Sequence, residues 1–230
     1  MATAMELIED FETLAAPNHR YASFDYCFNY FDTHRQTAAA PEKIENSCMH
    51  LGAYLASWGM FRGSSFLLKT KSMRHFRKVV EVIASDDSAP LWNIDCNGYD
   101  LENVELLLQA YRRIRDAVIP NRESELILVT KIMLAVFACV PAFDGQFTST
   151  LRKYADLQGQ RCGFWTFDRS ALLCLSRFYN LHREVIDETS MRTRTFDFTT
   201  GERLGTNPTY KRAKIMDMIG FQANGEVVEP

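Results

Sequence analysis

Hydrophobic residues follow a helical spacing along most of the chain. The longest apolar run spans residues 123–140, and its apolar side chains do not keep to one stripe of a helix. A helix that is apolar nearly all round is buried by its neighbours. Thr130 and Lys131 interrupt this run, which is also too short to cross a membrane. We therefore predict a buried central helix over residues 123–140, ended by Pro141, which cannot continue a helix ladder.

Shorter segments around this run carry the spacing and the end signals of further helices. The predicted helices cover residues 1–14, 24–31, 41–61, 73–84, 101–119, 147–157, 169–188 and 208–221. Candidate caps are Ser23, Ser72, Asp100, Asp144, and Thr166 or Asp168. Residues 194–204 alternate briefly and predict a small β-hairpin. Because the connections are short, we expect an all-α fold in which residues 1–230 form a single multi-helix globular domain.

Composition narrows the class of protein. The hydrophobic fraction is 47% and the charged fraction 24%, which is typical of a folded soluble chain. A net charge of −3 does not favour nucleic acid as a partner, although a local basic patch is not excluded by it. Six cysteines occur without a CxxC pair, which predicts buried free thiols in a reducing cytoplasm. We expect a cytoplasmic protein with no membrane partner, no metal and no cofactor, and the oligomeric state is left open.

The third predicted helix carries the most unusual row of side chains. His50, Tyr54, Trp58 and Arg62 are spaced four apart, so successive members touch on a helix surface. Gly59 and Gly63 bracket the end of the row and leave room for a ligand or another element. The candidate ligand-binding residues are His50, Tyr54, Trp58, Arg62, Ser64, Ser65 and, from the later loop, Asp144.

Arg62 has two competing interpretations. Its guanidinium has the fork geometry that recognises a carboxylate or phosphate, which predicts a small anionic ligand or a partner protein. Alternatively, Arg62 pairs with a buried carboxylate, Trp58 fills the core and the two serines cap a turn. Residues 57–68, SWGMFRGSSFLL, are similar to bacterial helical proteins without an assigned activity. The leading hypothesis is a bacterial-type intracellular binding protein that is non-enzymatic or catalytically degenerate.

Residues 140–152, VPAFDGQFTSTLR, lie between two predicted helices. This segment and its flanks, residues 123–182, resemble the Fic/Doc (Fido) family around its active loop, HPFxxGNGR. Pro141, Asp144 and Gly145 are in register, but Val140 stands where the family has its catalytic histidine. Gln146, Phe147 and Thr148 replace the loop's Asn, second Gly and Arg. The resemblance implies a fold derived from nucleotide transferases in which Val140 cannot act as a base. Without it, the segment is a helix stop followed by an N-cap at Asp144.

Arg177 and His182, in SRFYNLH, resemble the R-x4-6-H signature of HEPN ribonucleases. In that family, Arg and His from two protomers cleave RNA by acid–base chemistry, so the resemblance implies an RNase alternative. Five residues on a helix separate the two side chains by about 140°, so they do not share one face. A third hypothesis, an interaction subunit of a defence or toxin–antitoxin system, rests on analogy alone.

Overall fold

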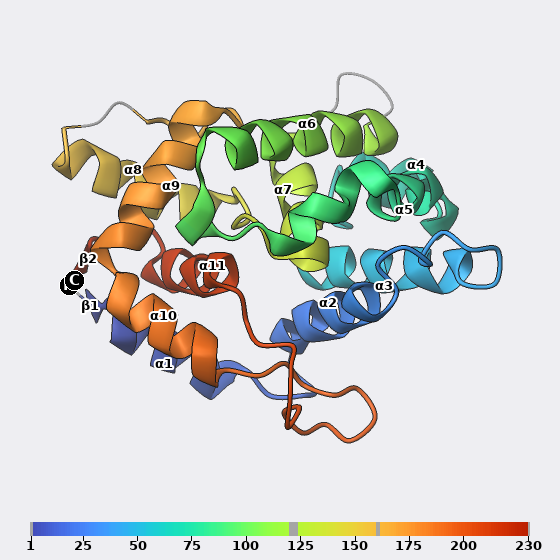
Figure 1. Cartoon of the computed structure of the whole chain (residues 1–230), viewed down its shortest axis with the longest axis horizontal. Coiled ribbons are helices and arrows are strands. Elements are labelled where there is room, and N and C mark those ends of the chain that lie inside the picture. The colour runs from blue at the N-terminus through green and yellow to red at the C-terminus, as the bar shows by residue number, and fades with distance from the viewer. Residues whose placement is uncertain (1, 120–123, 160–161, 230) are drawn as a thin grey trace.

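A computed structural model of the chain describes residues 2–119, 124–159 and 162–229. Within this part the fold is all-α (Figure 1). The α-helices are α1 (Ala4–Leu14), α2 (Ser23–Thr33), α3 (Ile44–Ser57), α4 (Phe66–Thr70), α5 (Arg77–Ile83), α6 (Leu101–Val118), α7 (Leu126–Phe137), α8 (Gly145–Leu157), α9 (Arg169–Leu181), α10 (Arg183–Arg192) and α11 (Arg212–Ala223). Short 3-10 turns occupy Arg20–Ala22, Met73–Phe76, Asp86–Asn93 and Cys96–Gly98.

The predicted central helix is confirmed as α7. Every residue from Leu128 to Phe137 is buried, including Thr130 and Lys131. The helix is shorter than predicted because Ala138 adopts a left-handed conformation (φ 46°), and the chain continues as buried coil to Phe143. Residue 123, the predicted first residue, lies outside the described part of the chain.

Other helices wrap α7 in two groups. Helices α2, α3 and α6 pack directly against it, and Figure 1 shows α6 above α7 and α2 and α3 below. A second group forms around α11, which is buried between α1, α8 and α10. The loop that leaves α7 leads into α8, so it joins the two groups, and the candidate site forms beside this junction.

Three of the predicted caps are confirmed. The side chains of Asp100, Asp144 and Asp168 accept hydrogen bonds from backbone amides in the first turns of α6, α8 and α9. The prediction for Ser23 is wrong, because its hydroxyl donates to the Arg20 carbonyl at 2.6 Å and makes no capping hydrogen bond to α2. Ser72 precedes a 3-10 turn and its side chain makes no capping hydrogen bond.

The predicted helix over residues 169–188 is two helices. His182 leaves the helical region of backbone conformation (φ −107°, ψ 23°), and α10 begins immediately after it. The ring of His182 is buried against Phe178, with 4.5 Å between ring centroids. Packing of this side chain accompanies a change of direction that sequence spacing did not indicate.

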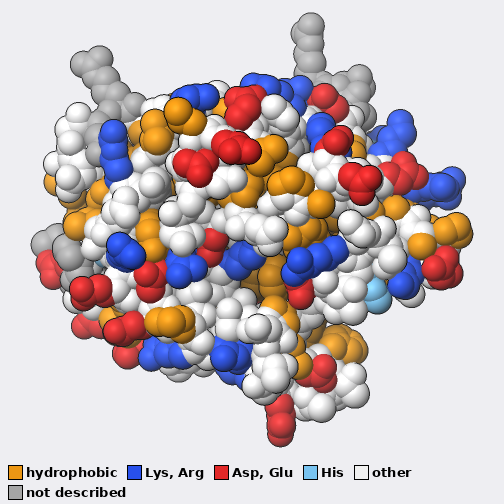
Figure 2. Space-filling model, in the orientation of Figure 1, with side chains coloured by type: hydrophobic (Ala, Val, Ile, Leu, Met, Phe, Trp, Pro, Cys, Tyr) orange, Lys and Arg blue, Asp and Glu red, His pale blue; other side chains and the backbone are white. Residues whose placement is uncertain are grey.

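Extended structure is minimal in the described residues. The predicted hairpin over 194–204 forms only isolated antiparallel bridges, Phe196 with Arg203 and Arg194 with Thr209. A separate parallel pair joins β1 (Ala2–Thr3) to β2 (Val228–Glu229). All six cysteines are free thiols, and five of them are buried. No helix in the described ranges is long and apolar enough to cross a bilayer. On the face of the molecule seen in Figure 2, acidic and basic side chains are interspersed.

Candidate functional site

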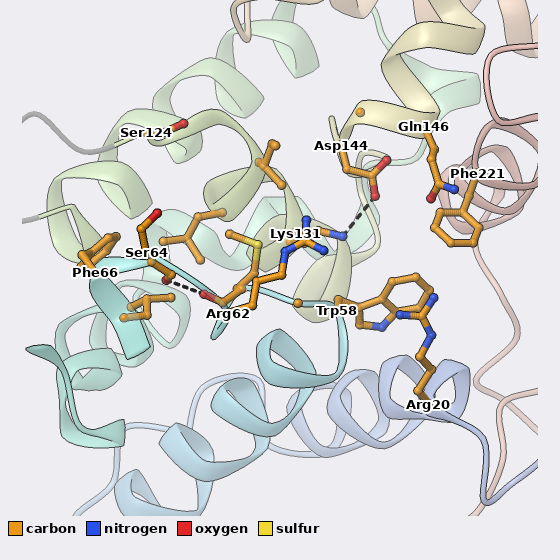
Figure 3. Close-up of a pocket in the computed structure, with 17 residues that line it drawn as sticks. Arg20, Trp58, Arg62, Ser64, Phe66, Ser124, Lys131, Asp144, Gln146 and Phe221 are labelled. Carbon is orange, nitrogen blue, oxygen red and sulfur yellow. Dashed lines mark hydrogen bonds and ion pairs between the residues drawn. The ribbon is translucent and has the colours of Figure 1, made fainter. Parts of the chain in front are cut away.

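A cavity of about 720 Å³ opens between the two helical groups. Its wall combines the segment after α3, one face of α7 and the first residues of α8, as Figure 3 shows. The lining residues are Arg20, Trp58, Gly59, Met60, Arg62, Ser64, Ser65, Phe66, Leu67, Ser124, Ile127, Leu128, Lys131, Asp144, Gly145, Gln146 and Phe221.

Most of the predicted ligand-binding residues meet in this cavity. Trp58, Arg62, Ser64, Ser65 and Asp144 all line it, although Asp144 is distant from the others in sequence. The remaining two predicted residues are placed differently. Tyr54 is buried beneath Trp58, with ring centroids 6.3 Å apart, and is 2% exposed. His50 is not among the lining residues and stacks on Tyr30 at 4.1 Å.

The turn after α3 sets the direction of the Arg62 side chain. Gly59 has φ 75°, a conformation that favours glycine, and Gly63 has φ 54°. A Cβ atom at position 59 would lie 3.4 Å from Arg62 Cδ, so the arginine side chain packs across this glycine. The hydroxyl of Ser65 donates to the Met60 carbonyl at 2.6 Å and closes the turn. Arg62 is thereby directed into the cavity (Figure 3).

Arg62 is not the partner of a buried carboxylate. Its side chain is exposed, and no ion pair to it occurs within the described residues. The alternative interpretation of Arg62 as one half of a buried ion pair is therefore wrong. Its guanidinium is available to an incoming anion.

The ion pair at the floor of the cavity is Lys131 with Asp144, at 3.2 Å. Both side chains are well shielded, with 5% and 17% of their areas exposed. Asp144 also accepts a hydrogen bond from the Phe147 amide at 3.1 Å, which fixes the start of α8. Lys131 Nζ lies 5.1 Å from the centre of the Trp58 ring, a cation–π distance. One lysine therefore ties α7 to α8 and positions Trp58.

A second, deeper ion pair lies behind Trp58. Lys214 and Asp217 are 3.3 Å apart, and their side chains are 1% and 8% exposed. Burial raises the pKa of Asp217, and the positive charge of Lys214 opposes this rise only in part. Asp217 also accepts a hydrogen bond from the Ala142 amide at 3.1 Å, so α11 supports the loop that leads into the cavity. Lys214 Nζ lies 5.5 Å from the Trp58 ring.

Trp58 is held by aromatic neighbours as well as by cations. Tyr21 stacks on it with 5.4 Å between centroids, and Phe221 meets it edge-on at 5.6 Å. The guanidinium of Arg20 lies 5.4 Å from both the Trp58 and the Tyr21 rings. The indole Nε1 is shielded from solvent and has no hydrogen-bond partner. These contacts fix the ring without satisfying its one donor.

Charge in the cavity is unbalanced. Lys131 is neutralised by Asp144, and no ion pair involves Arg20 or Arg62 within the described part of the chain. Asp144 is the single carboxylate among the described lining residues. Among the described residues, the cavity therefore has two arginines without an ion-pair partner, Arg20 and Arg62, and the first turn of α8 at Gly145 and Gln146 also lies on its wall.

Several lining residues were not predicted from the sequence. Arg20, Lys131, Gln146 and Phe221 come from four different elements, and the contacts that unite them are tertiary. A signal existed for Lys131, because a lysine inside an otherwise apolar helix requires a partner when it is buried. For Arg20 and Phe221, no local pattern indicates the cavity.

Arg177 and His182 do not form a pair within the chain. Arg177 is exposed, whereas His182 is 3% exposed and neither ring nitrogen has a hydrogen-bond partner. Burial lowers the pKa of His182 to about 4. A buried neutral imidazole is poorly placed for acid–base chemistry on RNA.

The loop that resembles the Fido motif contributes to the wall but lacks the family's chemical groups. Val140 is fully buried, and Phe147 packs so closely on Gly220 that a Cβ at position 220 would lie 2.4 Å from its ring. Asp144, Gly145 and Gln146 face the cavity. The loop thus supplies a helix start and polar atoms, with an apolar side chain where the family has its second glycine.

The described residues contain no group of three or more His, Cys, Asp or Glu side chains that could hold a metal ion. Comparison of the chain with protein-family models, with curated proteins and with solved structures finds no match. The case for function therefore rests on the cavity itself.

Proposed function

We propose that this chain is a non-enzymatic, cytoplasmic binding protein that holds a small anionic ligand in the cavity beside Trp58. The observation that carries the proposal is the pair of arginines, Arg20 and Arg62, which line the cavity without carboxylate partners in the described residues. Arginine side chains offer several N–H donors in a fixed fork, which suits carboxylate and phosphate groups.

The same wall gives little support for catalysis. The described lining contains neither histidine nor cysteine, and its carboxylate, Asp144, is engaged by Lys131 and by the start of α8. A general base needs a free lone pair near the reacting proton. The two enzyme hypotheses, a Fido-derived nucleotide transferase and a HEPN-like ribonuclease, are therefore less well supported than ligand binding. The hypothesis of an interaction subunit of a defence or toxin–antitoxin system is supported by no specific contact among the described residues.

The proposal is tested by calorimetric titration of the purified protein with inorganic phosphate and with acetate at low ionic strength. We expect binding of at least one of these anions. Arg62→Ala should weaken it about tenfold or more, because hydrogen bonds to charged groups contribute about 1.5–3 kcal/mol.

The matched control is Arg169→Ala, which removes an exposed arginine of α9 that does not line the cavity. This variant should bind as the unmodified protein does. Equal losses in the two variants would show that net charge alone attracts the anion, and unchanged binding in Arg62→Ala would contradict the proposal. Circular dichroism confirms that both variants remain folded.

A further inference from the structure

The cavity has two chemically different ends. One end is lined mainly by apolar residues from the segment after α3 and the first turn of α7, namely Met60, Phe66, Leu67, Ile127 and Leu128. Ser64 and Ser124 lie at the same end, near Phe66 (Figure 3). The other end carries Arg20, Trp58, Asp144, Gln146 and Phe221, and Arg62 and Lys131 lie between the two ends, as Figure 3 shows.

The geometry of α7 sets the distance from Lys131 to the end lined by Ile127. Ile127 and Lys131 are four residues apart, so they lie on one face of the helix and are separated by about 6 Å along its axis. This separation corresponds to about four to five carbon–carbon bonds of an extended chain. A ligand whose acidic head reaches Arg62, which lies beside Lys131 in Figure 3, would place any attached chain against Ile127 and Leu128.

The apolar end would gain from being covered. Met60, Phe66 and Ile127 are only partly buried, and Met60 and Phe66 also pack against the core. Removing such surface from water is favourable by about 0.8 kcal/mol for each buried methylene of a ligand. A bare inorganic anion would leave this half of the cavity unfilled.

Stacking of a ligand ring on Trp58 is disfavoured by the contacts already present. Tyr21 stacks on the indole, and Lys131, Lys214 and Arg20 each approach the ring within 5.5 Å of its centre. The apolar part of a ligand therefore has its room at the end formed by Met60, Phe66 and Ile127.

We infer that the ligand is an amphiphilic acid, with a carboxylate or phosphate head at Arg62, beside the Lys131–Asp144 pair, and an apolar body of at least four carbons along Ile127 and Met60. This inference rests on the proposed function of the cavity and specifies the ligand class. Binding would require no covalent step.

Matched probes separate the head from the body. Octanoate, acetate and octylammonium are titrated into the protein below the micellar range, and octyl phosphate is compared with inorganic phosphate. We expect octanoate to bind at least tenfold more tightly than acetate, and octylammonium not to compete with it. Whichever of octanoate and octyl phosphate binds more tightly identifies the preferred head.

Two variants test which end of the cavity binds which part of the ligand. Ile127→Gln should weaken octanoate about fivefold or more and leave acetate unchanged, whereas Arg62→Ala should weaken both. Met49→Gln is the matched apolar-to-polar control, since Met49 is 51% exposed on α3 and outside the cavity.

The outcomes distinguish two failures. Acetate binding as tightly as octanoate, or Ile127→Gln without effect on octanoate, would overturn the amphiphilic ligand and leave anion binding intact. No binding of any anion, or no effect of Arg62→Ala on any of them, would overturn the proposed function itself. Equal binding of octylammonium and octanoate would also overturn the inference, because it would show that the protein does not distinguish a negative head group from a positive one.

Discussion

Asp217, beneath the cavity, and Asp25, beneath residues 193–210, are both buried carboxylates, but their neighbours differ. Asp217 has Lys214 at 3.3 Å on the next turn of the same helix. Asp25 is fully buried, accepts one hydrogen bond from the Phe196 amide at 3.2 Å, and has a second oxygen without a partner. One carboxylate belongs to an ion pair, whereas the other accepts a single backbone hydrogen bond.

This difference has electrostatic consequences. Burial raises the pKa of Asp25 to about 7, and the nearby Tyr210 side chain and the Phe196 amide only partly oppose the effect. Asp217 has a cation in contact, which opposes the rise in its pKa that burial causes. The comparison teaches that the fold supplies paired charges beneath the proposed site and a protonatable group where a long connection is anchored to α2.

The largest effect should come from removing Lys214. Lys214→Met leaves Asp217 buried without its cation, and breaking a buried pair in this way costs about 3–5 kcal/mol. Urea unfolding followed by circular dichroism measures the loss. The double variant Lys214→Met/Asp217→Leu should recover much of it. A loss below about 1 kcal/mol in the single variant would show that Asp217 is neutral already, and the contrast with Asp25 would disappear.

A pH-dependent change in the free energy of unfolding is expected at Asp25. The folded protein keeps the proton on Asp25 until about pH 7, whereas the ordinary pKa is 3.8. The folded state therefore binds more protons than the unfolded chain in this window, and this group makes the free energy of unfolding fall as the pH rises from about 4 to 7.

Asp25→Asn removes this dependence while keeping a hydrogen-bond acceptor for Phe196. At pH 8 the variant should be more stable than the unmodified protein by about 4 kcal/mol, and at pH 4 the two should agree within about 1 kcal/mol. Urea unfolding of both proteins at the two pH values measures the difference in the free energy of unfolding. The two proteins share all other titrating groups, so the effects of those groups cancel in this difference. A variant less stable at pH 8 would show that the ionised carboxylate is the stabilising form.

The smallest loss of stability is expected for the Lys131–Asp144 pair, which is less deeply buried than Lys214–Asp217. Lys131→Met separates Asp144 from its cation, but the Asp144 side chain is 17% exposed and still accepts the Phe147 amide. Water can solvate this carboxylate, so the free energy of unfolding should fall by only about 1–2 kcal/mol. A loss equal to that of Lys214→Met would show that depth does not separate the two pairs.

Much of the architecture could be predicted from the sequence because it is encoded locally. The run around Ile132 is apolar on all sides, which indicates burial without any knowledge of the neighbours. Asp100, Asp144 and Asp168 each precede a helix by one residue, where a short acidic side chain reaches the free amides. The break at His182 had no such signal, since neither glycine nor proline marks it.

The candidate site was only partly predictable. Trp58 and Arg62 were found because they lie in one unusual row, and Asp144 because it ends a recognisable loop. Arg20 and Phe221 reach the cavity from opposite ends of the chain, and this juxtaposition depends on how α11 packs between α1 and α8. Asp217 illustrates the same limit, since its contact with Ala142 spans 75 residues.

The parallel pairing of Ala2–Thr3 with Val228–Glu229 has a mechanical consequence. A tensile load applied beyond the two strands would pull them in opposite directions along their common axis, which is the shear geometry. The hydrogen bonds between the two short strands would then be loaded together and not one at a time. Since α1 and α11 pack directly on each other, they would carry the load as soon as the pair ruptured.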